Sequence, residues 1–319
     1  MDPMPQGGRV RELDVLKGTA MLAVVTLHVS WYYLLAVPPA SATGRLFATL
    51  HMVSGLGVPL FLVCSAIALS LRYSEPMGLA AWGAFLLRRS WVLLPAYLFW
   101  SLVTAALLKP ATLWPGGRLA HLLLEGSADQ QFYFVPLLFS VYLLWPLLQP
   151  AAVASGRSPA TAVAVVALFA ALSVVWWKLS VLGFPFNAGP HLFPLWAVYV
   201  GVGLALAPYL GALARSASAR LTALAATVTV LAAVSMVATF YGSLLRPVSP
   251  AAIALAAMVF RRRRGAWLAA GLEAIGRRSY GIFLVHLLMC RALRWLLWPW
   301  LFGSLKPTTV LWPLFMPLE

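Results

Sequence analysis

The first apolar stretch of the chain, Glu12 to Val37, carries ionisable residues at spacings that could let them act together. An uncharged run of about twenty residues follows Lys17, long enough to cross a bilayer, and His28 lies part-way along it. On a helix, Lys17 and His28 share one face about 16 Å apart, and Asp14 lies within about 40° of that face. Because an ionisable residue inside a spanning helix usually faces a partner or a wet cavity, His28 is a candidate functional residue. The alternative is a buried histidine that donates to a neighbouring helix carbonyl and does no chemistry.

The composition is that of a helical membrane protein. Of the 319 residues 62% are hydrophobic and only 10% are charged, and the mean hydropathy is +0.88, which exceeds what a soluble core could absorb. We predict a single all-α integral membrane domain over residues 1–319. The net charge of +15 is better explained by loop orientation and anionic membrane lipid than by nucleic acid. No basic helix with interleaved exposed aromatics suggests a nucleic-acid groove, so we expect no nucleic-acid partner.

Motifs for several other chemistries are missing from the sequence. HExxH is absent, and we predict no metal site. There is no G-x-S-x-G elbow and no GxxxxGK[ST] loop, so a soluble-type hydrolase or a P-loop ATPase is unsupported. Cys64 and Cys290 both lie in apolar runs, so a disulfide is not expected. The first apolar run is too long for a signal-peptide core and is expected to remain as a signal anchor.

The apolar runs predict a polytopic bundle of about nine to ten transmembrane helices. Residues 1–12 form the segment before the first span. The eighth span is short and contains Pro247 and Pro250, and the segment 303–319 has too few apolar residues for more than an incomplete last helix. The predicted spans are 13–36, 46–71, 84–108, 131–149, 160–177, 191–210, 221–242, 247–260 and 279–302.

The lysine and arginine residues favour a cytoplasmic N-terminus. With nine alternating crossings, fifteen of the 23 Lys and Arg residues fall on the inner side and eight on the outer side, the bias that the positive-inside rule describes. This topology places His28 in the outer half of the first span. It places His286, about seven residues into the ninth span, in the inner half, and Asp129 in the outer loop between the third and fourth spans.

Five segments in chain order resemble those of the membrane acyltransferase-3 family. The first, RELDVLKGTAMLAVVTLHV at 11–29, is similar to the family's first helix, in which an arginine is followed after ten residues by a histidine. The others are GVPLFLVCSA at 57–66, FLLRRSWVLLPAYLFWS at 85–101, QFYFVPLLFSVYLLWPLL at 131–148 and IGRRSYGIFLVH at 275–286. Each segment is weak evidence by itself, and the five in order are strong evidence.

The resemblance implies a membrane O-acyltransferase of the bacterial plasma (inner) membrane. Such an enzyme moves an acyl group, commonly acetyl, from a cytoplasmic acyl-CoA to a hydroxyl of a cell-surface carbohydrate. The acyl-CoA is a co-substrate, no cofactor is bound permanently, and glycan-assembly proteins are expected partners. His28 takes the place of the family's catalytic first-helix histidine. That role suits a general base, since imidazole titrates near the working pH and can accept the proton of a sugar hydroxyl.

Basic residues at matching positions are candidates for binding the acyl donor. Lys17 occupies the family's arginine position, where it can hold donor phosphates as a point charge but lacks the bidentate fork of arginine. Arg88 and Arg89 match the family's third-span basic pair, and the alternative for them is ordinary positive-inside anchoring. The basic run 261–264 is most simply an anchor against anionic lipid, and steering of a polyphosphorylated donor is the alternative.

The remaining polar residues of the matched segments are supporting candidates. Ser65 and Ala66 stand where the family has a serine and a glycine, and Asp129 aligns with a glutamate that many members carry. His286 matches the family's ninth-span histidine, with either a functional role or a hydrogen-bonding, packing role. The supporting candidates are Asp14, Ser65, Asp129, Tyr280 and His286.

Two other classes of function are compatible with the sequence. The lysine at position 17 and the short C-terminal segment also suit a carrier or flippase of a surface-glycan precursor, or a family member that only scaffolds a glycan-modification complex. Consumption of acyl-CoA separates these hypotheses, because a carrier moves its substrate with the thioester intact. The predicted loops are short, so no appended domain points to one particular acceptor.

Overall fold

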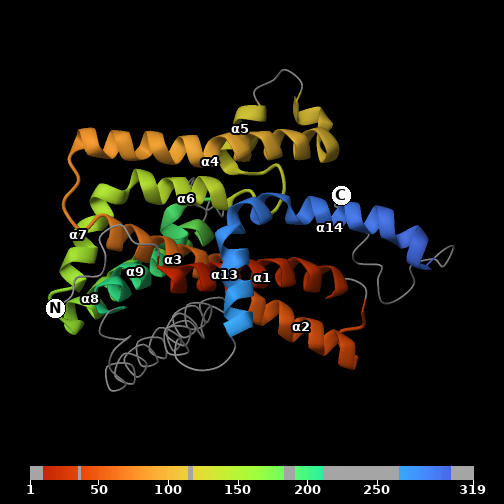
Figure 1. The fold of residues 1–319 in the computed structure, drawn as a ribbon, viewed down its shortest axis with the longest axis horizontal. Coiled ribbons are helices and arrows are strands. Elements are labelled where there is room, and N and C mark those ends of the chain that lie inside the picture. Colours follow the sequence, from red (N-terminus) through yellow and green to blue (C-terminus); the bar gives the residue numbers. More distant parts are fainter. Residues whose placement is uncertain (1–9, 35–36, 114–117, 183–190, 211–265, 303–319) are drawn as a thin grey trace.

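The computed structural model describes residues 10–34, 37–113, 118–182, 191–210 and 266–302 as helices joined by turns, with no strand among them (Figure 1). The prediction of an all-α fold is confirmed for this part of the chain. The elements are α1 (Arg11–Leu34), α2 (Ala42–Ser54), α3 (Gly57–Arg72), α4 (Leu79–Leu108), η1 (Pro110–Leu113), α5 (Arg118–Glu125), α6 (Phe134–Leu143), α7 (Trp145–Ser155), α8 (Pro159–Val181), α9 (Phe193–Leu206), η2 (Ala207–Tyr209), α13 (Ala266–Arg277) and α14 (Ser279–Phe302).

Four helical segments of the described chain are long and apolar enough to cross a membrane, and a fifth is added if the bent pair α6 and α7 counts as one span. The four are Arg11–Trp31, Ala42–Arg72, Leu79–Leu108 and Pro159–Ser180. Shorter apolar helices cover Phe193–Tyr209 and Ser279–Ala292. The spans predicted at 221–242 and 247–260, and the segment 303–319, lie outside the described residues. A count of nine to ten spans and a cytoplasmic N-terminus therefore stay predictions.

The span predicted at 131–149 is broken into two helices. α6 and α7 meet at an angle of 73°, and Leu144 lies between them. Pro146 is the second residue of α7 and cannot donate to the carbonyl of Tyr142. Trp82 lies within reach of that carbonyl, with its indole Nε1 3.5 Å from the oxygen. The bend carries α7 away from the direction of α6 (Figure 1).

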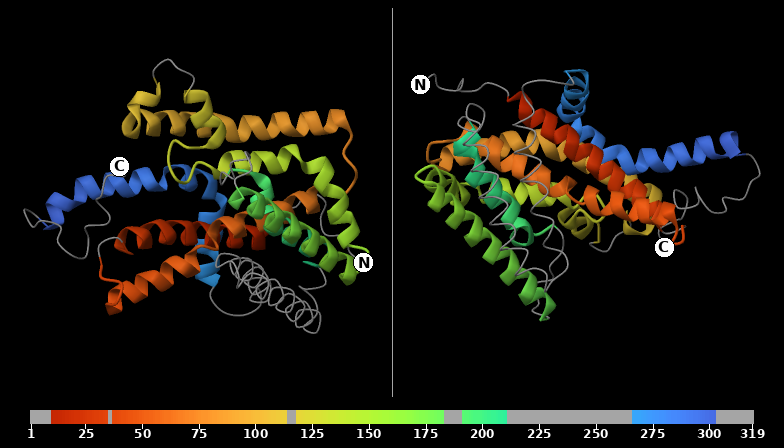
Figure 2. Two further views of the ribbon diagram at one scale, coloured as in Figure 1. Left: turned by 180° about the vertical axis from the view of Figure 1, so that it is seen from behind. Right: turned by 90° about the horizontal axis from the view of Figure 1, so that it is seen from below.

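The helix α1 lies among several others, in contact with α2, α3, α13 and α14 (Figures 1 and 2). Small residues permit the closest of these approaches. A Cβ atom at Gly57 of α3 would lie 2.7 Å from Val24 Cγ2 of α1. On the other side of α3, a Cβ atom at Gly203 of α9 would lie 2.6 Å from the Cβ atom of Ala66. The alanine at position 66 is thus accommodated because residue 203 is glycine.

The helix α13, which the sequence analysis did not predict, runs across α1 (Figure 1). A Cβ atom at Gly276 would lie 1.7 Å from the carbonyl oxygen of Asp14, and one at Gly18 would lie 2.0 Å from that of Leu272. Two glycines thus face the backbone of the opposite helix at this crossing. The contact fixes where α13 ends and where α14 begins relative to α1.

We expect Gly276→Ala to destabilise the protein by about 1–3 kcal/mol, because the added methyl group would overlap a backbone carbonyl that cannot move aside cheaply. The matched control is Gly271→Ala in the same helix, where nothing lies within 4 Å of the added Cβ atom. Removing a glycine from that helix interior should stabilise the protein by about 0.5–1 kcal/mol. Thermal unfolding in detergent measures both changes, and equal effects at the two positions would contradict the proposed crossing.

An ion-pair network joins α13 to the start of α1. Arg11 and Arg277 both donate to the carboxylate of Glu273, and these hydrogen bonds, led by the one from Arg277, lower the pKa of Glu273 below its usual value. Because the folded-state pKa is depressed, the stabilisation is complete above the unfolded-state pKa of about 4.3. It is lost as the pH falls through the folded-state value.

We therefore expect the melting temperature to fall as the pH is lowered below about 4.3, and part of that fall to come from Glu273. In Glu273→Gln this part should disappear. The melting temperature of the variant should therefore be lower than that of the parent at pH 7 and should vary less with pH. The measurement is thermal unfolding between pH 7 and pH 3. An unchanged pH dependence in the variant would show that the network contributes nothing to folding.

Candidate active site

The structure brings two of the candidate histidines together. The ring centroids of His28 on α1 and His286 on α14 lie 5.3 Å apart, with the ring planes tilted by 44°. His28 is partly buried, and His286 is only 5% exposed. The two residues come from opposite ends of the sequence, so their proximity is a product of the tertiary structure.

The prediction that His28 and His286 lie in opposite halves of the helical bundle was wrong. Counting from the start of an assumed ninth span placed His286 in the inner half and His28 in the outer half, whereas the two rings are in contact. The cause is α13, which crosses α1 at Asp14 and Gly18. Since α14 begins only after this crossing, its second turn lies beside the second half of α1 and not beside the start of α1.

A hydrogen bond fixes the tautomer of His286. Its Nδ1 atom lies 2.7 Å from the carbonyl oxygen of Phe283. A carbonyl can only accept, so Nδ1 carries the proton and Nε2 of the neutral ring is a hydrogen-bond acceptor. Nε2 is buried and has no partner among the described residues. The ring therefore presents an unused lone pair in the interior.

An ion pair lies close to the two histidines. Both carboxylate oxygens of Asp129 accept hydrogen bonds from the guanidinium of Arg291, and one of these contacts measures 3.2 Å. The side chains are only 4% and 16% exposed. The ionisable groups near enough to act electrostatically on His28 are His286, Asp129, His51 and Arg291. His28, His286, Asp129 and Arg291 together make up what we call the histidine cluster.

Arg291 was not predicted as a site residue. It is one of the eight Lys and Arg residues that the predicted topology assigns to the outer side, where a basic residue at the end of a span is common. An arginine inside an apolar helix is costly unless it is paired, and this was the signal that could have found it. Asp129, a supporting candidate, is its partner, and the pairing ties the connection between α5 and α6 to α14.

The connection between α5 and α6 places Asp129 and Gln131 in the interior of the protein. It turns at Gly126, whose φ of +69° favours glycine and where a Cβ atom would lie 2.5 Å from the carbonyl oxygen of Phe132. Gln131 is 2% exposed, and its Nε2 lies 3.5 Å from the carbonyl oxygen of Leu284. The loop therefore places two polar side chains against α14, Gln131 at Leu284 and Asp129 at Arg291, nearly two turns further along.

The histidine cluster has the components of an acid–base site. Imidazole exchanges protons near neutral pH, and a fixed pair of opposite charges beside it can stabilise charge that develops during a reaction. Elsewhere His121 and Glu125 pair across one turn of α5 at 3.5 Å. No group of three or more His, Cys, Asp or Glu side chains in the described ranges is arranged to hold a metal ion.

The other predicted residues lie apart from the histidine cluster or are engaged with the backbone. The Nζ atom of Lys17 is 3.8 Å from Oδ1 of the buried Asp14, beside the crossing with α13. The hydroxyl of Ser65 donates to the carbonyl of Phe61 at 2.7 Å. The hydroxyl of Tyr280 donates to the carbonyl of Leu93 at 2.6 Å and so joins α14 to α4. These last two contacts are typical of packing.

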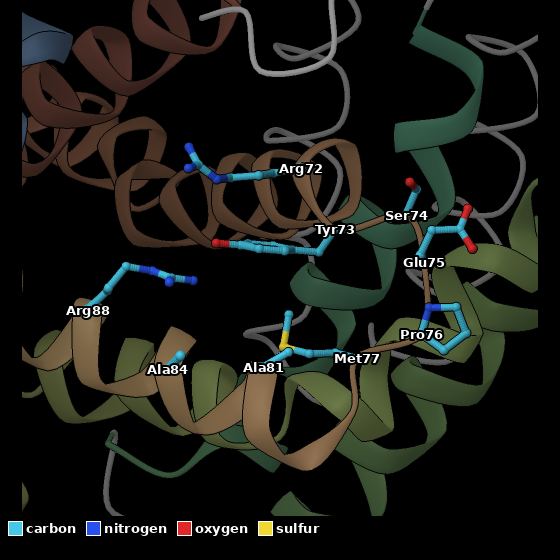
Figure 3. A pocket seen from close by; sticks show the side chains of 9 residues that line it. All are labelled: Arg72, Tyr73, Ser74, Glu75, Pro76, Met77, Ala81, Ala84 and Arg88. Carbon is cyan, nitrogen blue, oxygen red and sulfur yellow. The ribbon is translucent and has the colours of Figure 1, made fainter.

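The basic pair on α4 is divided between two environments. Arg89 lies over aromatic rings, with its Cζ atom 5.5 Å from the centre of Phe85 and 5.1 Å from that of Tyr142. Arg88 instead lines a cavity of about 360 Å³ between the end of α3 and the start of α4 (Figure 3). Arg72, which was not predicted, lies on the opposite wall. We call this space the arginine cavity; Tyr73, Ser74, Glu75, Pro76, Met77, Ala81 and Ala84 complete its lining.

A buried glutamine holds the loop that forms one wall of the arginine cavity. Gln149 of α7 is 3% exposed, and its amide nitrogen donates to the carbonyls of Tyr73, at 2.8 Å, and of Glu75. Its amide oxygen accepts from the backbone nitrogen of Met77 at 3.2 Å. All of these bonds go to the connection between α3 and α4, so Gln149 fixes the shape of this wall.

The arginine cavity and the histidine cluster lie at opposite ends of α3. Gly57, at the start of that helix, touches Val24, one turn before His28 on α1. Arg72 is the last residue of α3, about 22 Å further along the helix axis. The molecule thus carries a basic, open site at one end of α3 and a buried acid–base site at the other.

Helices long and apolar enough to cross a membrane, with an ionisable cluster buried among them, are typical of an integral membrane protein. The chain matches a family model described as "Acyltransferase domain" over residues 10–318, and it therefore belongs to the membrane acyltransferase-3 family. The protein is a membrane acyltransferase. No curated protein and no solved structure was found to match the chain.

Proposed function

We propose that the protein transfers an acyl group, in the first instance acetyl, from a cytoplasmic acyl-CoA to a hydroxyl of a cell-surface carbohydrate in the bacterial inner membrane. The observation that carries this proposal is the contact of His28 with His286 beside the Asp129–Arg291 pair. Family membership supports the reaction class. The buried position of the histidine cluster supports a reaction in which water must be kept from competing with the acceptor.

In the proposed reaction His28 is the general base. It accepts the proton of the acceptor hydroxyl while the oxygen attacks the thioester carbonyl, so that a C–O bond forms and the carbonyl electrons move onto its oxygen. The tetrahedral intermediate collapses, the C–S bond breaks, and the imidazolium returns the proton to the departing thiolate. The acyl group ends on the acceptor oxygen, CoA leaves as the thiol, and His28 is neutral again.

The arginine cavity is the proposed binding site for the nucleotide part of the donor. Two guanidinium groups, Arg72 and Arg88, line it, and arginine binds phosphate through paired hydrogen bonds. Glu75 also lines the cavity and is available to accept hydrogen bonds from an amino group. An extended thioester arm would have to cover the distance along α3 to reach His28, and Lys17 lies on that side of α1, near Cys64 of α3.

We expect Arg88→Ala to raise the KM for acetyl-CoA about 10- to 150-fold, since it removes a charge-assisted contact worth roughly 1.5–3 kcal/mol. Arg89→Ala should have the smaller effect on this KM, because its guanidinium packs on aromatic rings. The control is Arg157→Ala, an exposed arginine at the end of α7. Purified protein in nanodiscs, labelled acetyl-CoA and a crude envelope glycan fraction provide the assay. Equal KM values for the Arg88 and Arg157 variants would contradict the donor site.

The same assay decides whether the protein catalyses at all. Label that appears on glycan with release of free CoA supports the transferase. Label that crosses the membrane with its thioester intact would instead establish a carrier. Binding of acetyl-CoA without turnover in the presence of the glycan fraction would contradict the proposed acceptor class.

A further inference from the structure

Two hydrogen-bond acceptors next to the histidine cluster are buried without a partner. They are Oε1 of Gln131 and Nε2 of His286, on side chains that are 2% and 5% exposed, and neither has a partner among the described residues. A buried polar atom left unpaired costs about 1–3 kcal/mol. Most buried polar atoms in proteins are paired, so each of these two atoms is expected to have a binding partner that the described residues do not supply.

Both side chains donate a hydrogen bond to a backbone carbonyl in one turn of α14. Gln131 directs its amide nitrogen at the carbonyl of Leu284, at 3.5 Å, and His286 directs Nδ1 at the carbonyl of Phe283, at 2.7 Å. Each bond uses the donor of the side chain, because a carbonyl cannot donate. Turning the amide of Gln131 over would place two oxygens against each other. In both residues it is therefore the acceptor atom that remains unused.

The missing partner must be a hydrogen-bond donor. The thioester carbonyl and the phosphates of an acyl-CoA are acceptors, so only the amide N–H groups and the hydroxyl of its arm compete with the hydroxyl groups of the acyl acceptor, and a raised KM for acetyl-CoA in Gln131→Met would reveal that case. A protonated amine would bring an unpaired positive charge into the interior, where the charge of Asp129 is already balanced by Arg291. Neutral hydroxyl groups satisfy the chemistry without these difficulties.

We propose that Oε1 of Gln131 and Nε2 of His286 accept hydrogen bonds from hydroxyl groups of the acyl acceptor, which makes them specificity-determining residues for a polyhydroxylated substrate. This inference rests on the proposed function, in which the acceptor hydroxyl reacts at His28. Gln131 opens the fourth family-like segment, but neither the sequence analysis nor the proposed reaction gives it a role, and the inference assigns it a binding role. It also gives His286 a role beyond its hydrogen bond within α14.

Two buried glutamines provide a matched test. Gln131→Met removes an unused acceptor atom and one long hydrogen bond, whereas Gln149→Met removes three bonds to the wall of the arginine cavity. We expect Gln131→Met to raise the acceptor KM about 3- to 10-fold, as the loss of one neutral hydrogen bond predicts. Its KM for acetyl-CoA and its melting temperature should be unchanged. Gln149→Met should show the reverse, a higher KM for acetyl-CoA and a lower melting temperature.

The variants of His286 add a second comparison. His286→Phe keeps a ring but has no acceptor, and it should raise the acceptor KM. His286→Gln carries an amide oxygen and should recover part of the loss, which a role in packing alone would not predict. Acceptor binding is also measured without chemistry, as the rise in melting temperature that the envelope glycan fraction produces in nanodiscs.

The outcomes separate this inference from the proposed function. A parent protein that is stabilised by the glycan fraction but releases no CoA would contradict the proposed reaction, while loss of that stabilisation in Gln131→Met would still support the binding role. A parent that turns over while Gln131→Met keeps both its acceptor KM and its stabilisation by glycan would overturn the inference. A parent with neither turnover nor stabilisation would overturn both.

Discussion

Replacing His28 by alanine is expected to reduce acyl transfer by about 10²- to 10⁴-fold, the usual contribution of a general base. The residue lies within 5.3 Å of the His286 ring, measured between ring centroids, and the charges of Asp129 and Arg291 act on it. The loss should appear in kcat, because the proposed donor site at the far end of α3 is untouched. The measurement is label on glycan with acetyl-CoA and glycan both saturating.

His121→Ala provides the control for this prediction. His121 is exposed on α5 and pairs with Glu125, so its loss should leave kcat within about twofold of the parent, as is usual for surface substitutions. The KM for acetyl-CoA should be unchanged in His28→Ala. Transfer by purified His28→Ala at the parental rate would show that another group accepts the proton.

Breaking the pair of Asp129 and Arg291 is expected to have the largest effect on stability. Either Asp129→Asn or Arg291→Met leaves one charge buried without its partner, which costs about 3–5 kcal/mol. Replacing both residues removes the uncompensated charge, and the double variant should recover most of the loss. Thermal unfolding of the parent, the two single variants and the double variant in one detergent forms the complete cycle.

The activity of the double variant distinguishes a purely structural role of the ion pair from a role in the reaction. If the pair only joins α14 to the loop after α5, recovery of stability should bring back kcat. We expect stability to return while kcat stays at least tenfold below the parent, because the charges beside the histidines belong to the proposed active site. A double variant with parental kcat would reduce the pair to a structural contact.

The sequence by itself determined the fold class and several of the helices. The predicted spans 13–36, 84–108 and 160–177 correspond to α1, α4 and α8 within a few residues. This succeeds because the length and hydropathy of a segment report its transfer into lipid, a property of each segment alone. The five family-like segments also identified the class of enzyme, which the family match confirms. Among the candidate residues, His28, Asp129 and His286 do come together.

Only the tertiary structure decided how these residues meet. The position of His286 along α1 depends on the crossing of α1 and α13, where each helix has a glycine. The pairing of Arg291 with Asp129 depends on the rotation of α14, and the separate roles of Arg88 and Arg89 depend on which face of α4 meets α6. Hydropathy treats each segment independently, whereas depth and rotation follow from contacts between helices far apart in the sequence. The histidine cluster therefore depends on the contacts between α1, α13 and α14, and no single segment contains it.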